Sequence, residues 1–320
     1  GSHELWIERV GGKGFDPHHV QALTLATQDW VLDAAKGTEI LQAAWDLGIN
    51  TIDTANIYSN GESERIIGNW IKKSQIPRER LIIATKCYGI VGHAPSIMAY
   101  LRPELKDERD YVNQSGLSRG AIFNAVDASL ARLQLSYIDL LQIHRFDPAV
   151  PVEETMKALH DLVQSGKVRY IGASSMRAWQ FALMNEVAEK KGWTKFVSMQ
   201  NEYSLLYREE EREMNAYCNY NGIGLIPWAP LGAGSLARPL SVSTARSKDR
   251  KHSAADEAII KRVEELAEKK GVTMSQIALA WVGGKVASPI VGFNSVQRVA
   301  EGVTTGISLS EEEIKYLEES

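Results

Sequence analysis

Four side chains with complementary acid–base chemistry stand at or just after short apolar stretches: Asp53, Tyr58, Lys86 and His144. A tyrosine is a weak acid near neutral pH. A neighbouring lysine ammonium favours its phenolate form, and a carboxylate beside the lysine holds that ammonium charged and oriented. These residue types suit the reduction of an aldehyde or ketone to an alcohol. In this interpretation Tyr58 is the general acid, Lys86 and Asp53 tune it, and His144 orients the carbonyl.

The hydride for such a reduction has to come from a cofactor, because no side chain supplies one. Trp228 offers an aromatic face for a nicotinamide ring, and Ser174, Gln200 and Asn201 offer polar groups for its carboxamide. No metal is expected. The predicted partner is therefore a small carbonyl or alcohol substrate together with a nicotinamide cofactor.

Each of these residues also has an explanation without catalysis. Asp53 could be a turn residue after a strand, and Lys86 a solvated residue at the start of a loop. His144 could be a satisfied core histidine, and Trp228 a packing residue. Their joint placement at the ends of successive apolar strands favours one common pocket. In that pocket a buried Lys86 requires Asp53 beside it, because an unpaired buried charge is costly.

The carboxylate of this set is carried by a predicted strand over 49–53, which is rich in β-branched residues. Gly48 precedes the strand and ends a helix predicted over 38–47, as glycine commonly does. Tyr58 follows five residues after Asp53, on a predicted loop. Both side chains can therefore face the same pocket.

The rest of the chain alternates short strands with amphipathic helices, which is typical of a parallel sheet covered by helices. An eighth strand is expected over 20–27, and Ser115 or Ser118 is expected to cap the helix that begins near residue 118. Two short helices follow the last strand. The clear strands are predicted at 49–53, 81–86, 137–144, 168–174, 196–200, 223–228 and 288–292, and further helices at 62–73, 118–133, 153–165, 178–190, 209–220, 254–270 and 275–281.

This alternation predicts an α/β fold, a (β/α)8 TIM barrel in one domain over residues 1–320, with the active site at the carboxyl ends of the strands. An open doubly wound sheet is the alternative, although no Gly-x-Gly-x-x-Gly motif follows an early strand. Two long loops, over 89–117 and 232–253, are expected to border the active site and the cofactor. Residues 1–3, Gly-Ser-His, resemble the remnant of a cleaved tag.

The composition is that of an ordinary soluble protein, with 44% hydrophobic and 24% charged residues. A net charge of -4 gives no electrostatic basis for binding nucleic acid or an anionic membrane. Two cysteines are too few for a disulfide framework, and no apolar run is long enough to span a bilayer. We therefore expect a cytoplasmic protein, either a monomer or a weak homo-oligomer.

The chain resembles the aldo-keto reductase superfamily from about residue 33 to 319. The segment 48–59 resembles the motif that carries the family's aspartate and tyrosine, 84–86 its lysine motif and 140–144 its histidine strand. The resemblance implies that Asp53, Tyr58, Lys86 and His144 form the family's catalytic tetrad. It also implies a (β/α)8 barrel that binds NADPH in an extended form without a Rossmann fold.

The same resemblance extends to the cofactor. Segments 171–175, 200–203 and 227–231 are similar to the family's nicotinamide and pyrophosphate segments, and 290–298 to its adenosine-phosphate segment. Arg298, Arg238 and Arg246 are the arginines expected to meet phosphate groups. The implied NADP(H)-binding residues are Ser174, Ser175, Gln200, Asn201, Trp228, Pro230, Leu231, Gly232, Gly234, Arg238, Gly292, Asn294, Arg298 and Glu301.

The branch that the chain resembles is that of the fungal aryl-alcohol-dehydrogenase-like enzymes, and it is also similar to the potassium-channel β subunits. Segments 107–118 and 205–214 carry this likeness. It implies substrates that are aromatic or belong to fungal secondary metabolism. Three features depart from the family. The usual cofactor-contacting turn after the first strand is absent from 10–32, Gly302 stands where many members have asparagine, and the loop after Trp228 is short around 239–253.

Two other functions remain open from the sequence. The first is an NADPH-binding, redox-sensing partner subunit with slow turnover, like the channel β subunits; these carry a different residue at the position of His144, which favours an enzyme here. The second is a different barrel enzyme, such as a phosphate-sugar isomerase, which needs no nicotinamide.

Overall fold

The computed structural model describes residues 19–21, 34–94, 97, 99, 102–242, 251–304 and 306–319. All seven clear strands are confirmed, and the eighth overlaps its predicted range at its first residues. The rest of the segment 10–32 lies outside the described residues, as does Arg246. The strands are β1 (His19–Gln21), β2 (Thr51–Asp53), β3 (Ile82–Cys87), β4 (Ile138–Ile143), β5 (Val168–Ser174), β6 (Ser198–Gln200), β7 (Gly224–Leu225) and β8 (Val291–Gly292).

The strands form one parallel sheet that closes on itself. Their order is β7-β6-β5-β4-β3-β2-β1-β8. The backbone amides of Ala287 and Ser288 donate to the carbonyl oxygen of Leu225, at 3.0 and 3.1 Å, and the amide of Ile290 donates to that of Pro227 at 2.8 Å. These bonds join the segment before β8 to β7. The predicted barrel is therefore confirmed, and the open doubly wound sheet was the wrong alternative.

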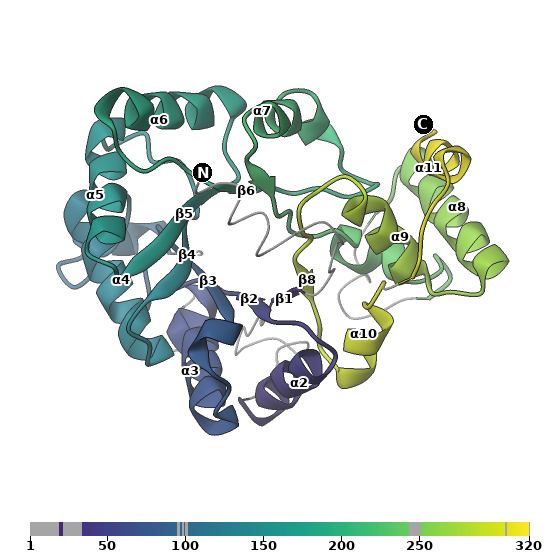
Figure 1. Cartoon of the computed structure of the whole chain (residues 1–320), viewed down its shortest axis with the longest axis horizontal. Helices are drawn as coiled ribbons and strands as arrows, with labels where there is room; N and C mark the ends of the chain where they lie inside the picture. Colours follow the sequence, from purple (N-terminus) through teal and green to yellow (C-terminus); the bar gives the residue numbers. More distant parts are fainter. Residues whose placement is uncertain are drawn as a thin grey trace.

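The helices lie outside the ring of strands, and α8 and α11 pack beside α9 on one flank (Figure 1). The side chain of Ser118 accepts a hydrogen bond from the amide of Ala121, so Ser118 rather than Ser115 is the cap. The helices are α2 (Ala34–Asp46), α3 (Glu62–Ser74), α4 (Arg119–Leu133), α5 (Val152–Gln164), α6 (Ala178–Lys191), α7 (Met214–Tyr220), α8 (Ala254–Lys270), α9 (Met274–Gly283), α10 (Val296–Glu301) and α11 (Glu311–Glu318).

Alternation along each strand separates the core from the inside of the barrel. On β4, Leu141 and Ile143 belong to the large cluster between strands and helices, whereas Leu140 belongs to a small cluster inside the barrel. Gln142 lies on the same side as Leu140, nearer the carboxyl end. The barrel is therefore apolar in its middle and polar at the end where the strands terminate.

Several predicted elements differ from the structure in their bounds. The predicted helix over 209–220 begins as a short 3₁₀ turn at Glu209–Glu211, and α7 starts only at Met214. The regular part of the predicted strand over 223–228 is confined to β7, although the amides of Ile226 and Trp228 still donate to the carbonyl oxygens of Met199 and Asn201. Trp228 therefore stands just beyond the regular sheet.

Candidate active site

Asp53 and Lys86 form a buried ion pair at the carboxyl end of the barrel. The ammonium of Lys86 donates to the Asp53 carboxylate and, at 2.9 Å, to the carbonyl oxygen of Thr54. The two side chains are 1% and 3% exposed. Burial acts to lower the pKa of Lys86, but Asp53 and Tyr58 outweigh it, so that the pKa is raised and Lys86 stays an ammonium.

The hydroxyl group of Tyr58 lies 3.5 Å from Nζ of Lys86. Tyr58 opens a tight turn in which Ser59 and Asn60 have left-handed backbone, with φ of 48° and 52°, before Gly61 at 88°. Asparagine is among the few residues besides glycine that visit this region routinely. The turn brings the phenol back over the end of β3.

Asn60 anchors the start of the long loop that borders the site. Its side-chain oxygen accepts from the amide of Gly92, and its Nδ2 donates to the carbonyl oxygens of Ala94 and Ile97, each at 2.8 Å. Asn60 is only 8% exposed. The residue that follows the Tyr58 turn therefore also holds part of the 89–117 loop. This role was not predicted from the sequence.

His144 follows β4 directly, and its amide donates to the carbonyl oxygen of Cys87 at 3.0 Å. Its ring centre lies 6.0 Å from that of Tyr58, edge to face. Burial, together with the charges of Lys86 and Arg145, lowers the pKa of His144 to about 2, so the imidazole is neutral. Its Nδ1 is buried and has no hydrogen-bond partner among the described residues.

Two glutamines reach the same carboxylate from across the barrel. Nε2 of Gln142 and Nε2 of Gln200 each donate to Oδ1 of Asp53 at 2.9 Å. Gln200 was expected to bind a cofactor carboxamide, and here its amide nitrogen contacts Asp53. Gln142 was not predicted, although it lies two residues before His144 and alternation places it on the inner face of β4.

Trp228 and the two serines at the end of β5, Ser174 and Ser175, lie together on another side of the site. The indole Nε1 of Trp228 donates to Oγ of Ser175 at 3.1 Å, and the hydroxyl oxygen of Ser174 lies 3.4 Å from that of Ser175. The amide of Trp228 donates to the carbonyl oxygen of Asn201. Oδ1 of Asn201 is buried and has no donor among the described residues.

Two arginines that are far apart in the sequence approach each other beyond β7 and β8. The pKa of Arg238 is lowered by burial and by the positive charge of Arg298. A Cβ at Gly234 would lie 3.8 Å from the Arg238 guanidinium, so this guanidinium lies over the turn at Gly232–Ala237. No ion pair of Arg298 is found among the described residues. The pair forms a positively charged patch.

The remaining predicted cofactor residues lie on the chain segments that carry Arg238 and Arg298. Pro230 and Leu231 lead into the turn at Gly232–Ala237. Gly292 ends β8 and is exposed, as is Asn294 just beyond it.

The end of α10 explains one departure from the family. Glu301 accepts a hydrogen bond from Nε2 of Gln297 at 2.8 Å. A Cβ at Gly302 would lie 2.5 Å from the ring of Phe293. Glycine is therefore required at 302 while this ring packs against it.

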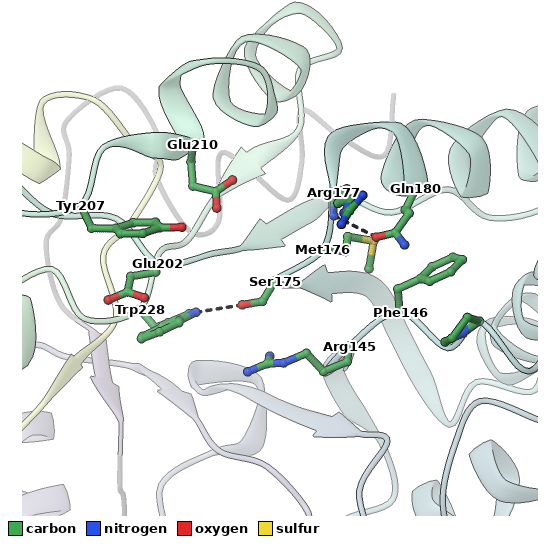
Figure 2. A pocket seen from close by; sticks show the side chains of 11 residues that line it. Arg145, Phe146, Ser175, Met176, Arg177, Gln180, Glu202, Tyr207, Glu210 and Trp228 are labelled. Atoms are coloured by element: carbon green, nitrogen blue, oxygen red, sulfur yellow. Dashed lines mark hydrogen bonds between the residues drawn. The ribbon is translucent and has the colours of Figure 1, made fainter.

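A cavity of about 530 Å³ opens over these strand ends. Figure 2 shows the guanidinium of Arg145 directed toward the side of Trp228 and the dashed bond from Trp228 to Ser175. The lining residues are Arg145, Phe146, Pro148, Ser175, Met176, Arg177, Gln180, Glu202, Tyr207, Glu210 and Trp228.

The described part of the chain lacks both a metal-binding cluster and a membrane-spanning helix. It contains no group of three or more His, Cys, Asp or Glu side chains arranged to hold a metal ion. None of its helices is both long enough and apolar enough to cross a bilayer.

Known fungal reductases and dehydrogenases are similar in sequence to this chain. The chain is 54% identical over 305 residues to an aldo-keto reductase of Fusarium vanettenii, covering 91% of this chain and 82% of that protein. It is 48% identical to the versiconal hemiacetal acetate reductase of Aspergillus parasiticus, covering 91% and 88% of the two chains. An aryl-alcohol-dehydrogenase-like protein of Schizosaccharomyces pombe is 49% identical, with 91% and 94% covered.

A solved structure has the same fold. It is a thermostable aldo-keto reductase in complex with the inhibitor epalrestat, with a TM-score of 0.71, 27% identity, and 94% and 93% of the two chains covered. The profile of the Aldo/keto reductase family matches residues 22–320. The chain therefore belongs to the aldo/keto reductase family, among relatives that include fungal aryl-alcohol-dehydrogenase-like proteins.

Proposed function

We propose that this protein reduces an aldehyde or ketone to an alcohol, with NADPH as the hydride donor. The observation that carries the proposal is the contact chain from Asp53 through Lys86 to Tyr58, with the ring of His144 beside the phenol. An acid, a charge that stabilises its conjugate base, and a neutral hydrogen-bonding ring meet at the carboxyl end of the barrel. These are the groups that carbonyl reduction needs.

Residues on the other side of the site fit the cofactor. Oδ1 of Asn201 is a buried acceptor without a donor among the described residues, which suits the NH2 group of a carboxamide. Trp228, fixed by Ser175, supplies a flat face for the ring. Arg238 and Arg298 place two positive charges together, and phosphate groups would relieve their repulsion. When bound, the nicotinamide supplies the hydride.

The geometry around Tyr58 supports its role as the proton donor. The phenol gives its proton to the carbonyl oxygen as the carbonyl carbon is reduced, and a phenolate remains. The ammonium of Lys86, 3.5 Å away, stabilises that phenolate, and Asp53 keeps the ammonium in place. Water then returns a proton to Tyr58 after the alcohol leaves.

His144 has a different role because its pKa of about 2 prevents it from acting as an acid near neutral pH. A neutral imidazole has one N–H and one lone pair. It can therefore donate to the carbonyl oxygen and orient it toward Tyr58 without transferring a proton itself.

The cavity favours an aromatic carbonyl substrate. Phe146, Tyr207 and Trp228 supply three aromatic walls, and Met176 adds a polarisable one. The relative from Aspergillus parasiticus is named as a reductase of versiconal hemiacetal acetate. We therefore propose substrates of fungal secondary metabolism that carry an aromatic ring.

The direct test is titration with NADPH and, in parallel, with NADH. Binding is monitored by the quenching of tryptophan fluorescence. We expect tight binding of NADPH, weaker binding of NADH, and turnover of an aromatic aldehyde. Trp228→Phe should remove much of the quenching, whereas Trp179→Phe, at a position 57% exposed, should not. Failure of the wild-type protein to bind either nucleotide would overturn the proposal.

A further inference from the structure

Three side chains from alternate strands form a closed polar ring inside the barrel. They are Asp53 on β2, Gln142 on β4 and Gln200 on β6. Gln142 and Gln200 each donate to Oδ1 of Asp53 at 2.9 Å, and Gln200 also donates to Oε1 of Gln142 at 2.9 Å. All three are buried. Barrel interiors are commonly filled in such layers from alternate strands, but mostly by apolar residues.

The directions of these hydrogen bonds are fixed. Oδ2 of Asp53 accepts from Lys86, and Oδ1 accepts from both glutamines. A carboxylate can accept from all three donors only while it is ionised. Turning either amide end for end would set an oxygen against Oδ1. Both amide hydrogens of Gln200 are used in the ring, so its Oε1 is the side-chain atom left for a ligand.

The neighbouring strand leaves room for this ring. Gly172 on β5 lies opposite Gln142 in the sheet register. A Cβ at position 172 would lie 3.3 Å from Cγ of Gln142 and 2.3 Å from Oγ of Ser198. Glycine at 172 therefore gives the Gln142 side chain its space, which supports the placement independently of the hydrogen bonds.

We propose that Gln142 is a positioning residue for the reduction: together with Gln200 it holds Asp53 as an anion in one orientation, and Asp53 in turn fixes Lys86 against Tyr58. This inference rests on the proposed function. Gln142 acts through Asp53 rather than through the substrate. It also keeps Gln200 oriented, so that one ring links the cofactor side of the site to the acid side.

Few other titratable groups around the ring change charge near neutral pH. His144, after β4, is neutral because its pKa is about 2, and burial raises the pKa of Cys87, next to Lys86, to about 12. Arg145 stays cationic. Glu64 of α3 accepts from Oγ1 of Thr85 and from Nε of Arg132, each at 2.6 Å. A substitution at Gln142 therefore acts on the pH profile through Asp53, Lys86 and Tyr58.

The test replaces Gln142 by a residue of similar length without polar atoms, Gln142→Met. Ser198→Ala is the matched control, because Oγ of Ser198 is buried in the same barrel and has no partner among the described residues. The readouts are the pH profile of kcat/KM for aldehyde reduction and the Kd for NADPH.

For Gln142→Met we expect kcat at neutral pH to fall about tenfold and the alkaline limb of the profile to move up by about one pH unit, because the phenolate is less stabilised. NADPH binding should weaken by a few-fold, about 2 to 5 times, because Gln200 loses its acceptor. Ser198→Ala should match the wild type in both readouts. A uniform loss of rate with an unmoved limb would show a merely structural role and overturn the inference.

A second variant, Gln142→Glu, decides the matter if the methionine variant does not fold. At acidic pH the introduced carboxyl is protonated and can donate to Asp53, so turnover should approach that of the wild type. As the pH rises the introduced carboxyl ionises beside Asp53, and turnover should fall. A profile parallel to that of the wild type would overturn the inference.

The two proposals fail in different ways. If the wild-type protein binds no NADPH, or reduces no aldehyde with it, the proposed reduction itself is wrong. If it passes both tests but the limb does not move in the Gln142 variants, only the role of Gln142 is wrong.

Discussion

Nζ of Lys86 lies 3.5 Å from the hydroxyl oxygen of Tyr58, while the same ammonium is bound to the Asp53 carboxylate. The phenol therefore faces a positive charge that cannot move away, because Thr54 also accepts from it at 2.9 Å. A fixed charge needs no reorganisation when a phenolate forms. This relationship makes Tyr58 the residue whose replacement is most informative.

Tyr58→Phe removes the acid and leaves the ring. We expect kcat to fall by about 10²- to 10⁴-fold, the usual contribution of a positioned general acid, while the Kd for NADPH stays within twofold, or about 0.4 kcal/mol. Tyr220→Phe, at a position 91% exposed, is the control and should keep full activity. Survival of turnover in the Tyr58 variant would show that another group supplies the proton.

Lys86→Met tests the buried ion pair. Removing one partner leaves the Asp53 carboxylate buried without its counter-charge, so we expect a loss of about 3–5 kcal/mol in the free energy of unfolding. The double variant Lys86→Met with Asp53→Asn should recover most of that stability without activity. Urea denaturation measures the free energy of unfolding of the single and the double variant. Equal stability of the single and double variants would contradict the pairing.

His144 should make the stability of the protein depend on pH. In the folded state its pKa is lowered from 6.5 to about 2, so between these values the unfolded chain binds a proton that the folded protein does not. The contribution of neutral His144 to the free energy of unfolding is present above pH 6.5 and is lost as the pH falls toward 2. His144→Gln should therefore lose less stability than the wild type between pH 7 and pH 5, as followed by urea midpoints. If stability changed with pH by the same slope in the wild type and in His144→Gln, His144 would not be held neutral.

Arg298→Ala tests the choice of cofactor. If Arg298 meets the 2′-phosphate, its loss should weaken NADPH binding by about 1.5–3 kcal/mol, a tenfold or larger rise in Kd, with little effect on NADH. Arg109→Ala, at a side chain 96% exposed, should change neither. Equal weakening of both nucleotides would place Arg298 at the shared pyrophosphate instead.

Much of the fold could be predicted because the signals are local. Each clear strand is a short apolar run, and glycines such as Gly192 and Gly271 end helices in left-handed backbone, which glycine adopts without strain. One exception was the strand over 223–228, whose regular part is confined to Gly224–Leu225. Its length depends on hydrogen bonds to a neighbouring segment, and a local pattern does not report these.

The ring around Asp53 shows why part of the site could not be predicted. Gln142 and Gln200 are 89 and 147 residues from Asp53 in sequence. Residue types predicted that the strand ends share a pocket, and alternation could have placed Gln142 inside the barrel. Which donors reach which oxygen depends on strand register and on the space left by Gly172, and both are properties of the closed barrel.

Asn60 offers the last test, because it joins the Tyr58 turn to the 89–117 loop. Asn60→Gly keeps the left-handed backbone, at φ of 52°, and removes the three hydrogen bonds to Gly92, Ala94 and Ile97. We expect faster proteolysis within residues 89–117 and a fall in kcat/KM of about tenfold, mostly through KM, since the wall of the substrate site is loosened.

Asn60→Ala separates the backbone from the side chain. It loses the same hydrogen bonds and adds the cost of left-handed backbone for a residue with a Cβ, about 1 kcal/mol. The alanine variant should therefore unfold at lower urea than the glycine variant, while both show the same KM. Unchanged proteolysis in both variants would mean that the loop is held by other contacts and that Asn60 serves only the turn after Tyr58.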